Sequence, residues 1–299
     1  MKVCAACSQS LSKDKFSKKQ WQFKQQRRCK ECISANREAK SDVPPNDAPL
    51  PASDSGGKEG ASDEDLFKKP PPRGDCDVCF EIMPLVGKGG KYMACCGKLL
   101  CTGCIYAAGG NQLGGKCPFC RTPDNVSDKE WIERLKKRVE TGDAHAHYVL
   151  GGRYSYGGRG MQQDDRKALK LWLRAVELGD TMAYHNIANA YYNGTGVKKD
   201  EKKAEYYWEL GAMEGDVYSR DTLGQLEAAS GNLERAVKHW MIAAGDGFDN
   251  SLQKIQQGYL EGFVTKGDFE KSLRAHKEAK DEVRTDQREA AAAALGFTY

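Results

Sequence analysis

The chain has 299 residues, and its 46 Lys and Arg against 42 Asp and Glu give a formal net charge of +4. No stretch approaches the roughly 18 apolar residues of a membrane span, and polar residues directly follow the start Met1–Cys7. Neither a membrane protein nor a secreted protein is therefore expected. The length predicts about two domains, and we expect a cytoplasmic or nuclear protein.

All 12 cysteines lie in the first 120 residues and form six close pairs. Two sulfurs on one tight turn can face one ion, so six pairs predict three four-cysteine zinc sites. The alternative is six disulfides, which would not persist in a reducing compartment. The pairs are Cys4 and Cys7, Cys29 and Cys32, Cys76 and Cys79, Cys95 and Cys96, Cys101 and Cys104, and Cys117 and Cys120.

Residues 1–40 form a first unit, in which two cysteine pairs close one zinc site and 11 basic side chains stand against 3 acidic ones, a net charge of +8. The run Phe16–Trp21 between the pairs resembles the Stc-one-type zinc domain, a small treble-clef or LIM-like module of chromatin-linked adaptors. Basic residues interleaved with aromatics can bind nucleic acid by phosphate contacts and stacking. In the alternative interpretation the aromatics cover the zinc and the charges are solvated.

Residues 41–73 are predicted to be a disordered linker. Pro, Gly, Ser and Asp dominate this stretch, which ends near Pro70–Pro72. Such a composition buries too little apolar surface to offset the entropy lost on ordering.

Residues 74–126 hold the remaining eight cysteines and together resemble a RING domain. In that family the ligand pairs alternate in a cross-brace, and a histidine usually lies near the position of Lys98. No histidine precedes His145 here, so the resemblance is to an all-cysteine variant. It implies that Cys76, Cys79, Cys101 and Cys104 bind one zinc ion and that Cys95, Cys96, Cys117 and Cys120 bind a second.

Two features of this unit follow from its residues. Cys95 and Cys96 are adjacent, and adjacent side chains point apart in an extended strand, so a shared ion requires a bend that Gly97 can permit. The apolar residues of the unit make only a very small core, so each structural zinc ion, at about 10–16 kcal/mol, is expected to hold the fold.

The RING resemblance implies ubiquitin-protein ligase activity, with a ubiquitin-conjugating enzyme docked on the zinc loops. Val78 and Pro118 match the apolar contacts of the two loops, and Arg121 matches the cation that bridges the enzyme and ubiquitin. Catalysis would proceed by orientation, with no catalytic residue, because every cysteine belongs to a zinc site and none is left as a nucleophile. The alternative is a non-enzymatic adaptor.

Residues 131–280 contain internal repeats. The segment 154–161 returns at 190–197, and Trp172 returns as Trp208 after 36 residues. A third copy is shorter and carries Trp240. Each copy fits a pair of helices that cannot bury its apolar face alone, so the copies must stack, with the tryptophans in the core.

These copies resemble the Sel-one-like repeat, a relative of the tetratricopeptide repeat. The resemblance implies a right-handed α-solenoid with a concave face that binds a protein target. Residues 281–299 are expected to form a polar C-terminal cap helix or tail. The predicted fold class is thus mostly α, with zinc-stabilised modules before an α-solenoid, three zinc ions in total, and no membrane contact.

Overall fold

The structure is a computed structural model that describes residues 61–85, 89–109, 115–158 and 160–296, together with two short strands near the N-terminus. The chain divides into two units, Met1–Ser55 and Gly56–Tyr299. In the first unit, β1 (Lys2–Val3) pairs antiparallel with β2 (Ser10–Leu11). The predicted ligands Cys4, Cys7, Cys29 and Cys32 lie outside the described residues, so the third zinc site stays a prediction.

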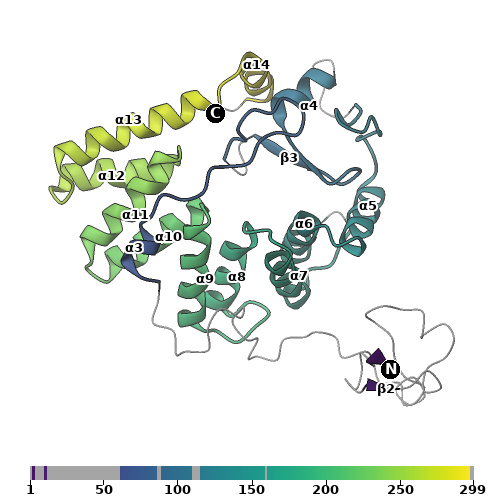
Figure 1. Ribbon diagram of the computed structural model, residues 1–299, viewed down its shortest axis with the longest axis horizontal. Helices are drawn as coiled ribbons and strands as arrows, with labels where there is room; N and C mark the ends of the chain where they lie inside the picture. The colour runs from purple at the N-terminus through teal and green to yellow at the C-terminus, as the bar shows by residue number, and fades with distance from the viewer. Residues whose placement is uncertain are drawn as a thin grey trace. The chain divides into compact units, whose positions relative to one another are not determined.

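Most of the second unit is a row of antiparallel helices that follow one another along the chain (Figure 1). Successive helices pack in pairs, α6 with α7, α8 with α9 and α10 with α11. This arrangement confirms the predicted class, a mostly helical repeat solenoid. The helices are α5 (Asp128–Glu140), α6 (Ala144–Tyr156), α7 (Asp165–Glu177), α8 (Ala183–Asn193), α9 (Glu201–Met213), α10 (Val217–Ala229), α11 (Leu233–Gly245), α12 (Asp249–Glu261), α13 (Lys266–Glu282) and α14 (Asp286–Leu295). Within the described ranges, no helix is long and apolar enough to cross a membrane.

The tryptophans of the repeats form the solenoid core, as predicted. Trp172, Trp208 and Trp240 are each less than a tenth exposed. Glycines on the preceding helices give two of them room, because a Cβ atom at Gly151 would lie 2.6 Å from the Trp172 ring, and one at Gly224 would lie 2.4 Å from Nε1 of Trp240. A side chain at either glycine would therefore force the paired helices apart.

The cysteine-rich part of the second unit is a small module. It contains the antiparallel hairpin of β3 (Gly90–Met93) and β4 (Lys98–Cys101), followed directly by α4 (Thr102–Ala108). Its core consists of Met83, Met93, Leu100 and Ile105 packed against buried cysteines. So few apolar side chains cannot hold a domain together alone, which agrees with the expected need for metal.

Residues 61–73 are ordered, which corrects the expectation of disorder for this part of the linker. The short helix α3 (Asp63–Leu66) packs against α9, and Leu66 is 1% exposed in the solenoid core. The composition of the segment does not predict this, because its order comes from contacts with residues about 150 positions further along the chain.

The C-terminal helix also packs differently from the expected cap. Helix α14 lies beside α4 of the cysteine-rich module (Figure 1). A Cβ atom at Gly103 of α4 would lie 3.0 Å from the backbone nitrogen of Arg288 on α14. The end of the chain therefore returns to the module, which contacts helices from both ends of the solenoid.

Candidate metal centre and interaction surfaces

The first cysteine quartet joins a tight turn to the end of the hairpin and the first turn of α4. It consists of Cys76, Cys79, Cys101 and Cys104, whose sulfur atoms all lie within 4.8 Å of one another. The Sγ atoms of Cys76 and Cys104 are 4.0 Å apart, and those of Cys79 and Cys101 are 3.8 Å apart. A zinc ion held tetrahedrally at about 2.3 Å places its sulfurs about 3.8 Å apart, so this quartet fits zinc.

The second quartet consists of Cys95, Cys96, Cys117 and Cys120. The distances between sulfur atoms are 4.0 Å from Cys95 to Cys96, 3.7 Å from Cys96 to Cys117 and 3.4 Å from Cys120 to Cys95. The two adjacent cysteines reach one centre because the chain turns sharply at Gly97, which has a φ of 76°. The bend expected from the sequence is therefore present.

The pairing of the quartets follows the cross-brace order, with the first pair beside the third and the second beside the fourth. All eight cysteines are free thiols, so the disulfide alternative is wrong for them. The module thus carries two four-cysteine clusters consistent with two zinc sites. With four protein ligands each, such sites would be closed and structural, with no open position for hydrolysis.

The thiols of the two quartets differ in acidity. Burial raises the pKa of the Cys95, Cys96 and Cys104 thiols, whereas the hydrogen bond with Cys101 lowers the pKa of Cys76 to about 4. Binding of a cation would release the protons of the thiols that still carry them. Backbone N–H groups already point at sulfur, since the amide of Cys101 donates to Sγ of Cys76 at 3.3 Å. Such donors stabilise thiolates once the metal is bound.

The two knuckles, 76–82 and 117–123, have the same backbone design. The amide of Phe80 donates to the Cys76 carbonyl at 2.9 Å, and the amide of Arg121 donates to the Cys117 carbonyl at 2.9 Å. Phe80 and Arg121 both adopt left-handed φ values, 58° and 62°. Arg121 thus occupies the knuckle position that Phe80 occupies in the first site, and both side chains are exposed.

The predicted docking residues lie at the tips of these knuckles. Val78 is exposed and Pro118 is half-buried. Phe119, beside Pro118, is 49% exposed as well, and no sequence signal marked it as a docking residue. One cation connects the tips, since Nζ of Lys98 lies 2.7 Å from Oδ1 of Asp77 and 5.3 Å from the centroid of the Phe119 ring. The tips of both knuckles therefore lie on one side of the module.

Arg288 of α14 connects the C-terminal helix to the end of the first knuckle. Its side chain is fully buried, and its guanidinium donates hydrogen bonds to the carbonyls of Ile82 (2.8 Å), Val283 (2.9 Å) and Glu81 (3.3 Å) and lies 3.8 Å from Sγ of Cys79. The guanidinium therefore ties the C-terminal helix to the backbone of a zinc knuckle. No sequence signal marks this arginine among the many charged residues of the tail.

The hairpin side of the module is held by the start of the solenoid. The hydroxyl of Tyr92 donates to Oδ2 of Asp143 at 2.7 Å, and Arg138 donates to the Cys95 carbonyl at 3.2 Å. Gly97 fits between them, because a Cβ atom there would lie 2.5 Å from the Asp143 carboxylate. Burial is the main cause that raises the pKa of Tyr92, so this phenol stays a hydrogen-bond donor.

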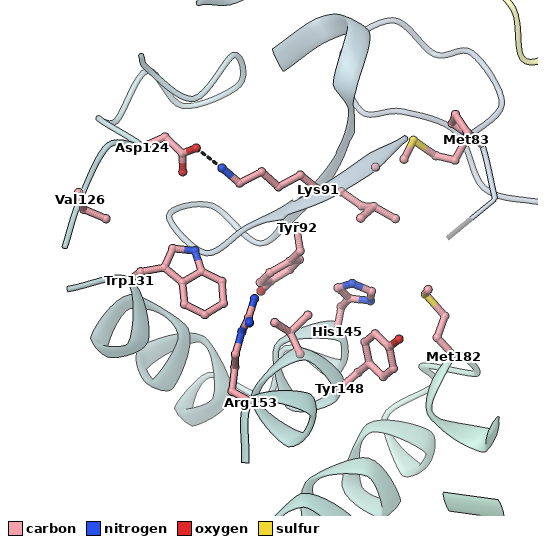
Figure 2. A pocket seen from close by; sticks show the side chains of 14 residues that line it. Met83, Lys91, Tyr92, Asp124, Val126, Trp131, His145, Tyr148, Arg153 and Met182 are labelled. Carbon is pink, nitrogen blue, oxygen red and sulfur yellow. Dashed lines mark hydrogen bonds and ion pairs between the residues drawn. The ribbon is translucent and has the colours of Figure 1, made fainter. Parts of the chain in front are cut away.

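A cavity of about 410 Å³ lies at this junction, a volume within the range of small-molecule sites. Figure 2 shows aromatic side chains around it, and two basic side chains of its lining lie within ion-pair distance of carboxylates. Lys91 pairs with Asp124, and His145 lies 2.7 Å from a carboxylate oxygen of Asp180. The labelled lining includes Tyr92, Trp131, Tyr148, Arg153, Met83 and Met182.

Comparison with known proteins identifies the repeats. The Sel1 repeat family matches residues 144–180 and 181–216, which contain the helix pairs α6–α7 and α8–α9. The Sel-one-like resemblance is therefore confirmed for these two copies, and the chain carries Sel1 repeats. Residues 74–126 have no RING family match, and a search of curated proteins gives no match.

Solved structures resemble the helical part. A Sel1 repeat protein from Oxalobacter formigenes is 28% identical over 54% of this chain and 67% of its own, with a TM-score of 0.46. A protective antigen of uropathogenic Escherichia coli with an SLR fold is 28% identical over 56% of this chain and 37% of its own, with a TM-score of 0.42. An immunity protein from Pseudomonas aeruginosa is 19% identical over 57% of this chain and 63% of its own, with a TM-score of 0.40.

Proposed function

We propose that the protein is a zinc-dependent ubiquitin-protein ligase of the RING type, in which residues 74–126 dock a ubiquitin-conjugating enzyme and the solenoid binds the target. The observation that carries the proposal is the cross-brace pairing of the two quartets, with the knuckle tips on one side of the module. The Sel1 repeats support the second half, because such stacked helix pairs expose extended surfaces for protein partners.

In this proposal the zinc ions hold the loops and take no part in the reaction. Val78 and Pro118 supply apolar contact from the two knuckles, and exposed Phe119 enlarges that surface. Arg121 offers a planar fork of donors that can grip a carbonyl or carboxylate on the conjugating enzyme and on ubiquitin together. Acceleration comes from holding the thioester in one reactive pose.

The test is discharge of ubiquitin from a panel of charged conjugating enzymes to free lysine by the full zinc-loaded chain. We expect Arg121→Gly, which suits the left-handed backbone of this position, to slow discharge about tenfold, the effect of about 1.4 kcal/mol lost from the transition state. Zinc content should stay unchanged. The control is Arg274→Ala on α13, another exposed arginine, which should leave the rate unchanged. No discharge with any conjugating enzyme would refute the proposal.

A second candidate is a non-enzymatic adaptor. The observation that favours it is the clamping of the module by Arg288 on one side and by Tyr92–Asp143 on the other, because a module fixed in this way can serve as a structural closure of the solenoid. A Val78→Ala/Arg121→Gly double variant separates the two functions. An adaptor would bind its partners as the wild type does, whereas a ligase would lose discharge activity.

Nucleic-acid binding by residues 1–40 stays a proposal from the sequence alone. The net charge of +8 of residues 1–40 implies binding through phosphate contacts, so the affinity of the protein for DNA or RNA should fall steeply with added salt. An affinity that does not change with salt would argue against a charge-based interface.

A further inference from the structure

A groove on the solenoid is filled by a segment of the same chain. Residues 61–67 lie against α9, α10 and α11, with α3 in their centre (Figure 1). Leu66 inserts into the core and is 1% exposed. The Phe67 ring lies against His239 on α11, with ring centroids 4.7 Å apart.

Buried charged side chains of the groove bind the backbone of this segment. Arg220 on α10 is 2% exposed, and its guanidinium donates to the Leu66 carbonyl and, at 2.5 Å, to the Ala212 carbonyl. At the other end, the amide of Ala61 donates to Oε2 of Glu209 on α9 at 3.1 Å. Buried charges are costly unless they are fully hydrogen-bonded, so these two groups are built to receive a peptide backbone.

Cations at the rim of the groove favour an acidic and an aromatic side chain in the bound segment. Arg235 on α11 pairs with Asp63 in the first turn of α3. The cations of Arg235 and Lys238 lie 5.3 and 5.7 Å from the centroid of the Phe67 ring. An acidic helical turn therefore meets cations, and an aromatic side chain after the leucine gains cation–π contacts. The fitting sequence is a short acidic turn that ends in Leu-Phe.

The internal segment is an imperfect ligand. Both ring nitrogens of His239 are buried beneath Phe67 without a hydrogen-bond partner, which opposes docking. A four-residue helix is not stable on its own, so the segment stays docked because its tether gives it a high effective concentration. A partner segment of the same chemistry can compete when it is abundant or binds more tightly.

Burial, with smaller contributions from the nearby cations Arg220 and Arg235, lowers the pKa of His239 to about 3, whereas Asp63 acts in the opposite direction. The docked groove therefore contains a neutral imidazole. Release of the segment would uncover the face of this ring that Phe67 covers, and its pKa would move back toward the ordinary range.

We propose that the groove formed by α9, α10 and α11 is a peptide-binding site for a short acidic helical segment ending in Leu-Phe on a partner protein, and that residues 61–67 occupy it as an internal competitor. This inference rests on the target-binding half of the proposed function and is independent of ligase activity. It places an autoinhibitory contact at the centre of the solenoid.

The test uses the full zinc-loaded chain and a fluorescent peptide with the sequence of residues 61–70. A Leu66→Asp/Phe67→Asp variant of the chain evicts the internal segment, because two carboxylates cannot enter the apolar groove. We expect this variant, called the evicted chain because its internal segment has left the groove, to bind the peptide at least tenfold more tightly than the wild-type chain does. A peptide carrying Leu66→Ala should bind the evicted chain at least tenfold more weakly.

The proposal is overturned if the evicted chain binds the peptide no better than the wild type, or if the Leu66→Ala peptide binds equally well. Should the double variant fail to fold, Asp63→Lys in the chain is the second variant. It removes the exposed ion pair with Arg235 and should also make the chain bind the peptide more tightly than the wild type does. Unchanged affinity in that variant would contradict the proposal. Because the assay contains no ubiquitin, its outcome is separate from that of the discharge assay.

Discussion

Arg288 gives the sharpest test of how the module is held. Replacing it by Met keeps most of the buried stem but removes three hydrogen bonds, at 2.8, 2.9 and 3.3 Å, to the carbonyls of Ile82, Val283 and Glu81. A hydrogen bond to a charged group contributes about 1.5–3 kcal/mol, and losses within one network do not add fully. We therefore expect Arg288→Met to lower the free energy of unfolding by about 3–5 kcal/mol.

The assay is urea unfolding of the zinc-loaded chain, followed by circular dichroism, together with the rate at which a chelator removes zinc. Loss of Arg288 should speed zinc release, because the first knuckle loses its support. The matched control is Arg284→Met, whose side chain is 58% exposed and pairs with Asp281 and Glu289. That change should alter stability by less than about 1 kcal/mol. A loss of less than about 1 kcal/mol in Arg288→Met would refute the anchoring role.

Three further outcomes are expected. Gly151→Ala should destabilise the solenoid by about 1–3 kcal/mol in thermal unfolding, because the new Cβ would lie 2.6 Å from the Trp172 ring. The control Gly152→Ala, with open space around its Cβ, should be neutral or stabilising. Equal effects of the two changes would contradict the close packing at Gly151. Binding of the 61–70 peptide to the evicted chain should weaken as the pH falls from about 7.5 to about 5.5, because free His239 takes up a proton that the bound state excludes. The loss is at most about tenfold, since Arg220 and Arg235 stay close to the free ring, and His239→Phe should abolish this dependence. Chelation of zinc should make residues 74–126 sensitive to protease while the helical content of the repeats persists; an unchanged digestion pattern would argue against structural zinc.

The repeats and the metal clusters could be predicted because their signals are local. Trp172 and Trp208 recur at a fixed spacing of 36 residues, and close cysteine pairs leave few arrangements for tetrahedral sites. The cross-brace order itself came from the resemblance to a known family. The bend at Cys95 and Cys96 could be anticipated because two ligands to one ion demand it.

The contacts that join the linker segment and the module to the solenoid could not be predicted. Leu66 stands in a polar stretch with no periodicity, and its burial depends on Arg220 and Glu209 more than 140 residues away. Arg288 resembles its exposed neighbours until the fold places it beside a zinc knuckle. Both cases depend on long-range placement of a charged group, for which composition and hydrophobic pattern carry no signal.

The central claim is that sulfur quartets hold zinc and thereby shape the interaction surfaces of the module. X-ray absorption spectroscopy at the zinc edge, on the full chain after its metal content has been measured, tests this directly. We predict a first shell of four sulfur atoms at about 2.3 Å, with three zinc ions per chain, two of them lost when Cys76 and Cys117 are both replaced by Ser. A shell that contains oxygen or nitrogen, or a chain that folds fully without zinc, would contradict the account.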